Sequence, residues 1–275
     1  MKILVTGANG QLGREVVRQG KDHELVLTDY DTLDIANCKA VALFMREIKP
    51  QAVIHCAAYT NVDGAEKDED GAFRVNVVGA QNIAAGCLET GARMVYVSTD
   101  YVFDGTKTEA YREFDQVNPQ SVYGRTKWQG EELVRRILGR HYIVRTAWLY
   151  GDGNNFVRTM LRLAETNDTL RVVHDQVGTP TSTVDLAKAI FALLDSDAYG
   201  TYHATCQGQC SWYEFACEIF RQAGKKVKII PVTTDEFPRP AKRPAHSVLD
   251  NYMLRMTVGD TTRPWQESIK EYIKR

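Results

Sequence analysis

Three polar side chains in the first half of the chain have the types and spacing of an acid–base site. Tyr123 and Lys127 stand four positions apart in a segment with helical spacing, and Thr99 follows the apolar run 93–98. Residues four apart share one helix face, so the lysine charge can lie near the phenol and lower its pKa from the usual value of about 10. A hydroxyl at Thr99 can bind the same substrate oxygen. The trio therefore predicts proton transfer to or from an oxygen atom.

Each member of this trio has an alternative interpretation. A Tyr-x-x-x-Lys pair also occurs by chance in helices, as an exposed aromatic and basic neighbour. Ser98 is a rival for the hydroxyl role, although neighbouring strand residues point to opposite faces. Either hydroxyl can also serve simple turn chemistry.

A turn rich in glycine lies near the start of the chain. Gly7, Gly10 and Gly13 stand between the apolar run 3–6 and a helix expected to reach about Gln19. Glycines at such a turn let the pyrophosphate of a dinucleotide approach backbone amides at the helix N-terminus. The alternative is steric, because the turn needs glycine even without a ligand. The flanking strand and helix favour the dinucleotide.

Asp29 is the candidate for binding the adenosine ribose. It ends the second apolar run and lies nineteen residues after Gly10, close to the spacing of a ribose-binding acid. A carboxylate there would repel a 2′-phosphate and no arginine adjoins it, which favours NADH over NADPH. A loop aspartate that caps a turn is the alternative.

The order of the predicted elements indicates the fold. Apolar runs alternate with helical segments through the first half, and the runs are 3–6, 24–28, 52–56, 93–98 and 141–145, with helices at 38–48 and 71–90. Strands joined by crossover helices form a parallel sheet covered on both faces. We therefore expect an α/β fold with a Rossmann-like, doubly wound parallel sheet.

The second half of the chain has a different rhythm. Helical spacing returns at 155–166, 183–194 and 265–273, with a strand-like run at 171–173, and half of the prolines lie between 231 and 244, where we expect an irregular surface loop. We predict a dinucleotide-binding Rossmann domain over 1–150. Residues 151–275 would form mainly a smaller C-terminal substrate-binding cap that is interleaved with the sheet.

Composition narrows the class of protein. The 275 residues carry 34 Lys plus Arg against 35 Asp plus Glu, so the excess positive charge of a nucleic-acid binder is missing. The 44% hydrophobic residues suit an ordinary globular core, and the apolar runs are far shorter than the roughly 20 residues of a membrane helix. Scattered cysteines and the missing signal segment predict free thiols in the cytoplasm. The loose spacing of His203, Cys206, Cys210 and Cys217 does not favour a zinc site.

Several segments together resemble one family. They are TGANGQLG at 6–13, AAYTNVDGAE at 57–66, STDYVFDG at 98–105, VYGRTKWQGE at 122–131, RTAWLYG at 145–151, NNFVRTMLRLA at 154–164, DQVGTPT at 175–181 and RPAHSVLD at 243–250. In this order they resemble the extended short-chain dehydrogenase/reductase superfamily and, within it, the dTDP-4-dehydrorhamnose reductase family. The resemblance covers nearly the whole chain.

The resemblance implies an activity and a set of site residues. The activity is reduction, with NADH or NADPH, of the C4 keto group of dTDP-4-dehydro-L-rhamnose to dTDP-L-rhamnose, in the synthesis of nucleotide sugars and cell-surface polysaccharide. Thr99, Tyr123 and Lys127 would be catalytic. The cofactor would bind Gly7, Gly10, Gln11, Leu12, Gly13, Asp29, Asp34, Ile35, Ala58, Tyr59, Thr60, Val97, Tyr123 and Lys127. The sugar nucleotide would bind Thr99, Asp100, Tyr101, Trp148, Asn155 and Arg243.

The sequence departs from the family pattern at some positions. His246 stands where the family usually has asparagine, and Trp128-Gln129 replaces leucine-alanine. Some relatives dimerise through a metal held by glutamates; Glu15 matches part of that arrangement, but Val184 stands where a further carboxylate is expected. We therefore predict no metal and a monomer or weak homodimer.

Three other functions are alternatives to the reductase activity. A dehydratase needs an acidic pair after the strand-end threonine, and Tyr101 follows Asp100 here, which disfavours it. An epimerase of the same superfamily shares the Tyr-x-x-x-Lys spacing. The regulatory beta subunit of methionine adenosyltransferase also resembles these reductases and would be a binding partner that needs no intact trio.

Overall fold

A six-stranded parallel sheet forms the centre of the molecule. The computed structural model describes residues 1–274. The strands lie in the order β2 (Glu24–Thr28), β1 (Lys2–Thr6), β3 (Ala52–His55), β4 (Arg93–Thr99), β5 (His141–Thr146) and β10 (Gly200–His203), and every neighbouring pair is parallel. The strand order reverses between β1 and β3, which is where such sheets bind ligands. The predicted Rossmann-like fold is confirmed.

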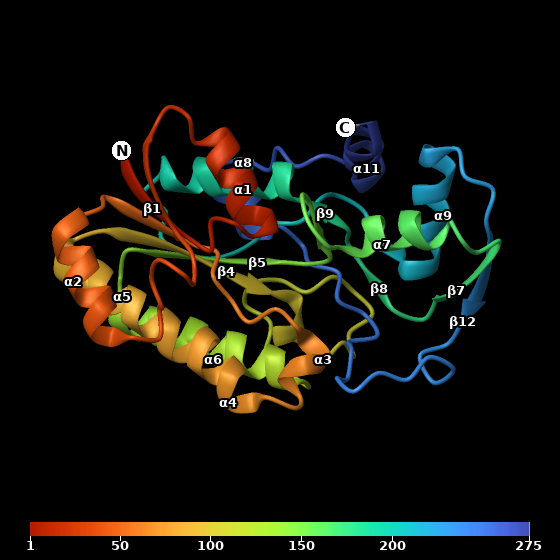
Figure 1. The fold of residues 1–275 in the computed structure, drawn as a ribbon, viewed down its shortest axis with the longest axis horizontal. Helices are drawn as coiled ribbons and strands as arrows, with labels where there is room; N and C mark the ends of the chain where they lie inside the picture. The colour runs from red at the N-terminus through yellow and green to blue at the C-terminus, as the bar shows by residue number, and fades with distance from the viewer. Residues whose placement is uncertain (275) are drawn as a thin grey trace.

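Helices cover both faces of this sheet (Figure 1). One face carries α1 (Gln11–Gln19) and α8 (Thr183–Leu194), and the other carries α2 (Cys38–Ile48), α5 (Ala80–Thr90) and α6 (Val122–Ile137). Alternate strand residues feed the two cores: Ile3 and Val5 pack with α1 and α8, whereas Leu4 packs with α2 and α5. Uninterrupted apolar strands are therefore needed, as the sequence indicated.

The helical segment predicted at 71–90 is divided in the structure. It consists of α4 (Glu69–Phe73), a π-helical turn (Arg74–Gly79) and α5, and it is preceded by the short helix α3 (Val62–Ala65). Asn76 lies in the π-helical turn, where its side-chain oxygen accepts from the Tyr59 amide at 2.8 Å and its amide donates to the Thr126 hydroxyl at 3.1 Å. The irregular turn thus ties the loop after β3 to α6.

The second half of the chain builds a cap beside the sheet. Its helices are α7 (Phe156–Leu163), α9 (Trp212–Ala223) and α11 (Trp265–Lys274), whereas α10 (Tyr252–Thr257) packs with the core of the main sheet through Leu254. Its two-stranded sheets pair β6 (Leu149–Tyr150) with β9 (Thr181–Ser182), β7 (Thr169–Val173) with β12 (Lys228–Val232) and β8 (Val177–Gly178) with β11 (Cys210–Ser211). Tyr150, Phe215 and Trp265 lie in the core of the cap. The chain also returns to the main sheet, to which it adds α8 and β10.

The proline-rich segment was predicted to be an irregular loop, and it is irregular after Val232. The first of its prolines departs from that prediction. Pro231 lies inside β12. Among the described residues β12 pairs only with β7, so it is an edge strand that has one side free of ladder hydrogen bonds and can accommodate proline.

Over residues 1–274, no helix has both the length and the apolar character needed to cross a membrane.

Candidate active site

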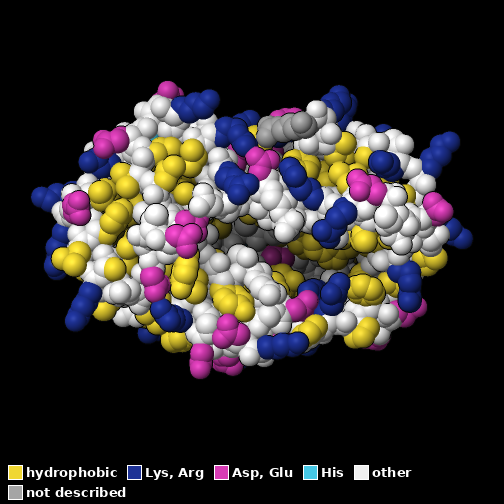
Figure 2. All heavy atoms as spheres, in the orientation of Figure 1, with side chains coloured by type: hydrophobic (Ala, Val, Ile, Leu, Met, Phe, Trp, Pro, Cys, Tyr) yellow, Lys and Arg dark blue, Asp and Glu magenta, His cyan; other side chains and the backbone are white. Residues whose placement is uncertain are grey.

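A deep cleft lies at the carboxyl ends of the sheet strands, between the sheet and the cap. Its volume is about 890 Å³, within the usual range for a ligand site. Figure 2 shows a hollow near the middle of this face. The predicted site residues that line the cleft are Gly7, Gly10, Gln11, Leu12, Gly13, Asp29, Asp34, Ile35, Ala58, Tyr59, Thr60, Val97, Thr99, Asp100, Tyr101, Tyr123, Lys127 and Trp148. Two predicted residues, Asn155 and Arg243, do not belong to this described lining.

Two glycines of the turn between β1 and α1 are needed for close packing of the protein's own backbone, as the steric alternative predicts, and a third leaves the start of α1 uncapped. Gly7 has φ of +66°, and a Cβ there would lie 2.7 Å from the Ala57 amide nitrogen. A Cβ at Gly13 would lie 2.2 Å from the Gly7 carbonyl oxygen. Gly10 is the N-cap of α1 and has no side chain to cap the helix, so the first amides remain for another acceptor. This turn fits the pyrophosphate of a dinucleotide.

The carboxylates of Asp29 and Asp34 border the other end of the cleft. Asp29 accepts from the backbone amides of Asn9 at 2.9 Å and Tyr30 at 2.8 Å. Asp34 pairs with the guanidinium of Arg74 at 2.7 Å. Asp29 therefore caps its own turn and faces the cleft at the same time, so the two interpretations of this residue are compatible.

The hydroxyls of Ser98 and Thr99 have different surroundings. Thr99 is the last residue of β4, not the residue beyond it as expected, and its hydroxyl donates to Asp100 Oδ1 at 3.0 Å and accepts from the Tyr101 amide at 3.2 Å. Ser98 also borders the cleft, but its hydroxyl donates to the buried Glu131 carboxylate at 2.5 Å. The structure thus places Thr99 beside the other candidate catalytic groups.

Helix α6 supplies the phenol and the ammonium. It starts at Val122, where the Ser121 N-cap hydroxyl accepts from the Gly124 amide at 3.1 Å. Tyr123 and Lys127 both line the cleft, and the rings of Tyr123 and Tyr101 form a T-shaped pair with centroids 5.5 Å apart. The predicted helix therefore brings both side chains to one ligand-sized space.

Burial controls the pKa values of this pair. It raises the pKa of Tyr123 to about 12, while a hydrogen bond with Thr99 acts in the opposite direction. Burial also lowers the pKa of Lys127 to about 7, against the attraction of Glu131. The expected lowering of the phenol pKa by the lysine is therefore wrong for the protein alone, because desolvation is the larger effect. At neutral pH the Tyr123 phenol keeps its proton and can act as a donor.

Asp100 is a further buried acid in the cleft. Burial raises its pKa to about 6, and hydrogen bonds with Ser247 and Thr99 oppose this rise. The carboxyl is 2% exposed. When the pH falls from neutral through about 6, the Asp100 carboxylate therefore gains a proton and loses its charge.

Aromatic side chains form the opposite wall of the cleft. Trp148 stacks on Trp212 with ring centroids 3.5 Å apart, and Phe156 lies 4.6 Å from Trp212. Trp148 has φ of +47°, an uncommon backbone conformation for a bulky residue, and a Cβ at Gly178 would lie 2.6 Å from its indole. Both features place the indole at the cleft, where it can stack on a flat ligand group.

Sequence reasoning missed several lining residues. Trp212, Phe156 and Asn154 come from the cap, and no spacing in the sequence links them to Trp148. Thr146 ends β5 as Thr99 ends β4, so the rule that ligands bind at strand ends would have indicated it.

The two predicted substrate residues outside the lining have protein partners. The Asn155 side chain caps α7 by accepting from the Arg158 amide, and it donates to the Gly151 carbonyl at 2.7 Å. Arg243 forms two hydrogen bonds of 3.0 Å with the carboxylate of Asp63 in α3. Arg243 thus joins the proline-rich segment to the rim of the sheet.

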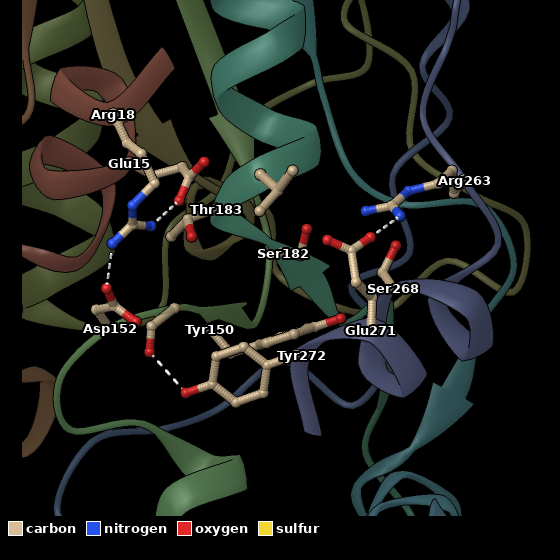
Figure 3. A pocket seen from close by; sticks show the side chains of 12 residues that line it. Glu15, Arg18, Tyr150, Asp152, Ser182, Thr183, Arg263, Ser268, Glu271 and Tyr272 are labelled. Atoms are coloured by element: carbon tan, nitrogen blue, oxygen red, sulfur yellow. Dashed lines mark hydrogen bonds and ion pairs between the residues drawn. The ribbon is translucent and has the colours of Figure 1, made fainter. Parts of the chain in front are cut away.

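Glu15 matches part of the glutamate arrangement that holds a metal in some relatives. It lies outside the cleft, in a cluster of charged side chains (Figure 3). It pairs with Arg18, which also pairs with Asp152 at 2.5 Å. Nearby, Arg263 pairs with Glu271 of α11. Within residues 1–274, no group of three or more His, Cys, Asp or Glu side chains is arranged to hold a metal ion. The described cysteines are all free thiols.

The fold and the cleft define a class before any relative is considered. A glycine turn after β1, a strand-end hydroxyl and Tyr123 with Lys127 on α6 are the arrangement of extended short-chain dehydrogenase/reductase folds. The chain belongs to the RmlD substrate binding domain family, which it matches over residues 1–275.

Individual relatives agree with this family. A crystal structure of a dTDP-4-dehydrorhamnose reductase from Clostridium acetobutylicum ATCC 824 is 59% identical, with a TM-score of 0.98 over 100% of this chain and 99% of that one. The dTDP-4-dehydrorhamnose reductase of Bacillus anthracis str. Ames, in complex with NADP, is 42% identical, with a TM-score of 0.96 over 99% and 98% of the two chains. The spore coat polysaccharide biosynthesis protein SpsK of Bacillus subtilis (strain 168) is 44% identical over 99% of this chain and 97% of its own.

Proposed function

We propose that this protein reduces the C4 keto group of dTDP-4-dehydro-L-rhamnose to give dTDP-L-rhamnose, with NADPH or NADH as the reductant. The observation that carries the proposal is the convergence of Thr99, Tyr123 and Lys127 on one cleft with the glycine turn. Relatives that match nearly the full length of the chain are named for this reduction. The product is a nucleotide sugar, and it would serve the synthesis of cell-surface polysaccharide.

Each residue of the trio has a distinct task in the proposed reaction. The bound nicotinamide supplies hydride. Tyr123 gives its proton to the oxygen on which negative charge develops, and its pKa of about 12 keeps that proton available at neutral pH. Thr99, whose hydroxyl proton is donated to Asp100 in the protein alone, would turn that proton to the same oxygen when the substrate is bound. Lys127 binds the ribose of the cofactor. Its pKa of about 7 leaves it partly protonated at neutral pH, and its charged form stabilises the charge left on Tyr123.

The cofactor fits the opposite end of the cleft. Gly10 leaves the amides at the start of α1 for the pyrophosphate, and Asp29 is available to the adenosine ribose. Asp29 favours a free 2′-hydroxyl, whereas one relative is described with NADP. We therefore propose that the protein accepts both cofactors, which a comparison of kcat/KM for NADH and NADPH will measure.

The sugar nucleotide would occupy the space between the trio and the aromatic wall. Asp100 and Tyr101 lie beside Thr99, and Trp148 offers an indole face. Asn155 and Arg243 would act indirectly, by fixing the loop that carries Gly151 and the helix α3 that carries Asp63.

The proposal is tested with purified protein and dTDP-4-dehydro-L-rhamnose. We expect loss of absorbance at the nicotinamide band in proportion to dTDP-L-rhamnose formed, identified by chromatography. An epimerase would convert sugar without net cofactor consumption. A regulatory subunit like the methionine adenosyltransferase beta subunit would give neither reaction and would instead copurify with a synthetase. Either result would overturn the assignment.

We also propose that the protein is cytoplasmic and that it is a monomer or weak homodimer. Sedimentation of the purified chain across a range of concentrations measures the second of these.

A further inference from the structure

Lys127 lies over the ring of a buried tyrosine that has no assigned role. Its ammonium nitrogen is 4.2 Å from the ring centroid of Tyr96 in β4. Both side chains are buried, and Lys127 is 3% exposed. We propose that Tyr96 is a positioning residue, whose ring face holds the Lys127 ammonium in place for its task in the cleft. The proposal rests on the role of Lys127 in the proposed function.

Contacts on every side fix the position of the Tyr96 ring. Its hydroxyl donates to the backbone carbonyls of Asn76 at 3.3 Å and of Lys127 at 3.2 Å. His55 stacks against the ring with centroids 5.8 Å apart. A Cβ at Gly130 would lie 2.3 Å from the Tyr96 hydroxyl oxygen, so glycine leaves the space that this hydroxyl fills. The ring is thereby anchored to the π-helical turn and to the helix that carries Lys127.

The charged groups around Lys127 explain why an aromatic face matters here. At the end of β3, His55 and the following residue Cys56 lie near the ammonium. Burial is the main cause that holds the pKa of His55 at about 3 and that of Cys56 at about 12, so both are neutral. The Tyr123 phenol is also neutral. One turn along α6, Glu131 is ionised and attracts Lys127.

The Glu131 carboxylate is shared among other donors. It accepts two bonds from Arg145, of 2.9 and 2.7 Å, one from Arg135 at 2.7 Å and one from Ser98 at 2.5 Å. Its attraction for Lys127 is therefore opposed by two nearby guanidinium groups. A ring face attracts a desolvated ammonium through its quadrupole, without bringing another charge into the site.

The experiment measures the titration of Lys127 directly. We would label lysine with ¹³C at the ε carbon and assign the Lys127 signal by its loss in Lys127→Arg. Tyr96→Phe keeps the ring and removes the hydroxyl, whereas Tyr96→Met fills similar space without a ring. We expect the Lys127 midpoint to stay in place in Tyr96→Phe and to fall by about one pH unit in Tyr96→Met. Equal midpoints in both variants, or an equal fall in both, would overturn the proposal.

A second variant covers the case in which Tyr96→Met does not fold. Pentafluorophenylalanine at position 96 has nearly the size of phenylalanine but reverses the charge distribution of the ring face. Its Lys127 midpoint must then lie below that of Tyr96→Phe, and an unchanged midpoint refutes the role of the ring. Since no substrate is needed, this titration is independent of the reductase assay. In an active enzyme, the basic limb of the kcat profile should move by the same amount.

Discussion

The two walls of the cleft are built in opposite ways. The sheet wall carries Thr99 at the end of a central strand and Tyr123 and Lys127 on one long helix, backed by two cores that cover the two faces of the sheet. The cap wall carries Trp148 and Trp212, which come from distant parts of the chain and meet by ring stacking. Regular elements therefore hold the groups that move a proton. The groups that would recognise the ligand are held by a packing contact between the segment after β5 and the first residue of α9.

The two walls therefore differ in the kind of interaction that they offer a ligand. The titratable groups of the sheet wall are buried, and burial is the main cause that moves the pKa of Tyr123 and Lys127. The cap wall offers aromatic surface, which contributes contact area and stacking. We expect changes in the sheet wall to affect the rate of the reaction and changes in the cap wall to affect binding of the sugar nucleotide.

The sharpest way to break this division is Tyr123→Phe. Loss of the phenolic proton should lower kcat by roughly 10²- to 10⁴-fold, because a positioned general acid contributes about that much. Steady-state kinetics with dTDP-4-dehydro-L-rhamnose measure kcat. The dissociation constant for NADPH, followed by fluorescence, should change little. A variant with near-normal kcat would remove Tyr123 from the chemistry.

The cap wall is tested by Trp148→Ala. We expect KM for the sugar nucleotide to rise on the order of 10-fold and kcat to fall less, because a stacking surface binds ground state and transition state alike. Trp212→Leu should give a smaller rise, since it removes only the support beneath Trp148. A loss in kcat as large as that of Tyr123→Phe would contradict the division between the walls.

A smaller effect is expected on stability, from Asp100→Asn. Burial raises the pKa of Asp100 to about 6, so the folded protein holds this proton more tightly than the unfolded chain does. The stability from this group is present below pH 4 and is lost as pH rises through about 6. Relative to wild type, Asp100→Asn should gain up to about 3 kcal/mol between pH 4 and pH 8. Urea unfolding at several pH values measures this difference, and parallel curves would argue against a raised pKa of Asp100 in the folded protein.

The sheet wall could be predicted from sequence because local patterns determine it. The apolar run 24–28 and the helices at 38–48 and 183–194 have the predicted bounds, because apolar runs and helical spacing are local features of the sequence. Four-residue spacing placed Tyr123 and Lys127 on one helix face.

Other features depend on contacts between distant residues and lay outside sequence reasoning. Nothing near Trp212 indicates that it stacks on Trp148, sixty-four positions earlier. The π-helical turn around Asn76 keeps ordinary helical spacing in sequence, and its purpose is a pair of bonds to the Tyr59 backbone and Thr126. The high pKa of Tyr123 depends on how much protein surrounds it, which spacing alone does not reveal.

The late position of β10 in the chain affects how the protein must fold during synthesis. Strand β5 ends at Thr146, but its outer neighbour begins at Gly200, and α8 covers the sheet only after Thr183 has been added. While the ribosome adds these residues, the nascent sheet has an unpaired edge and an uncovered apolar face. The first half is therefore at risk of aggregation until about two hundred residues have emerged, and a chain cut near residue 150 would retain that risk permanently.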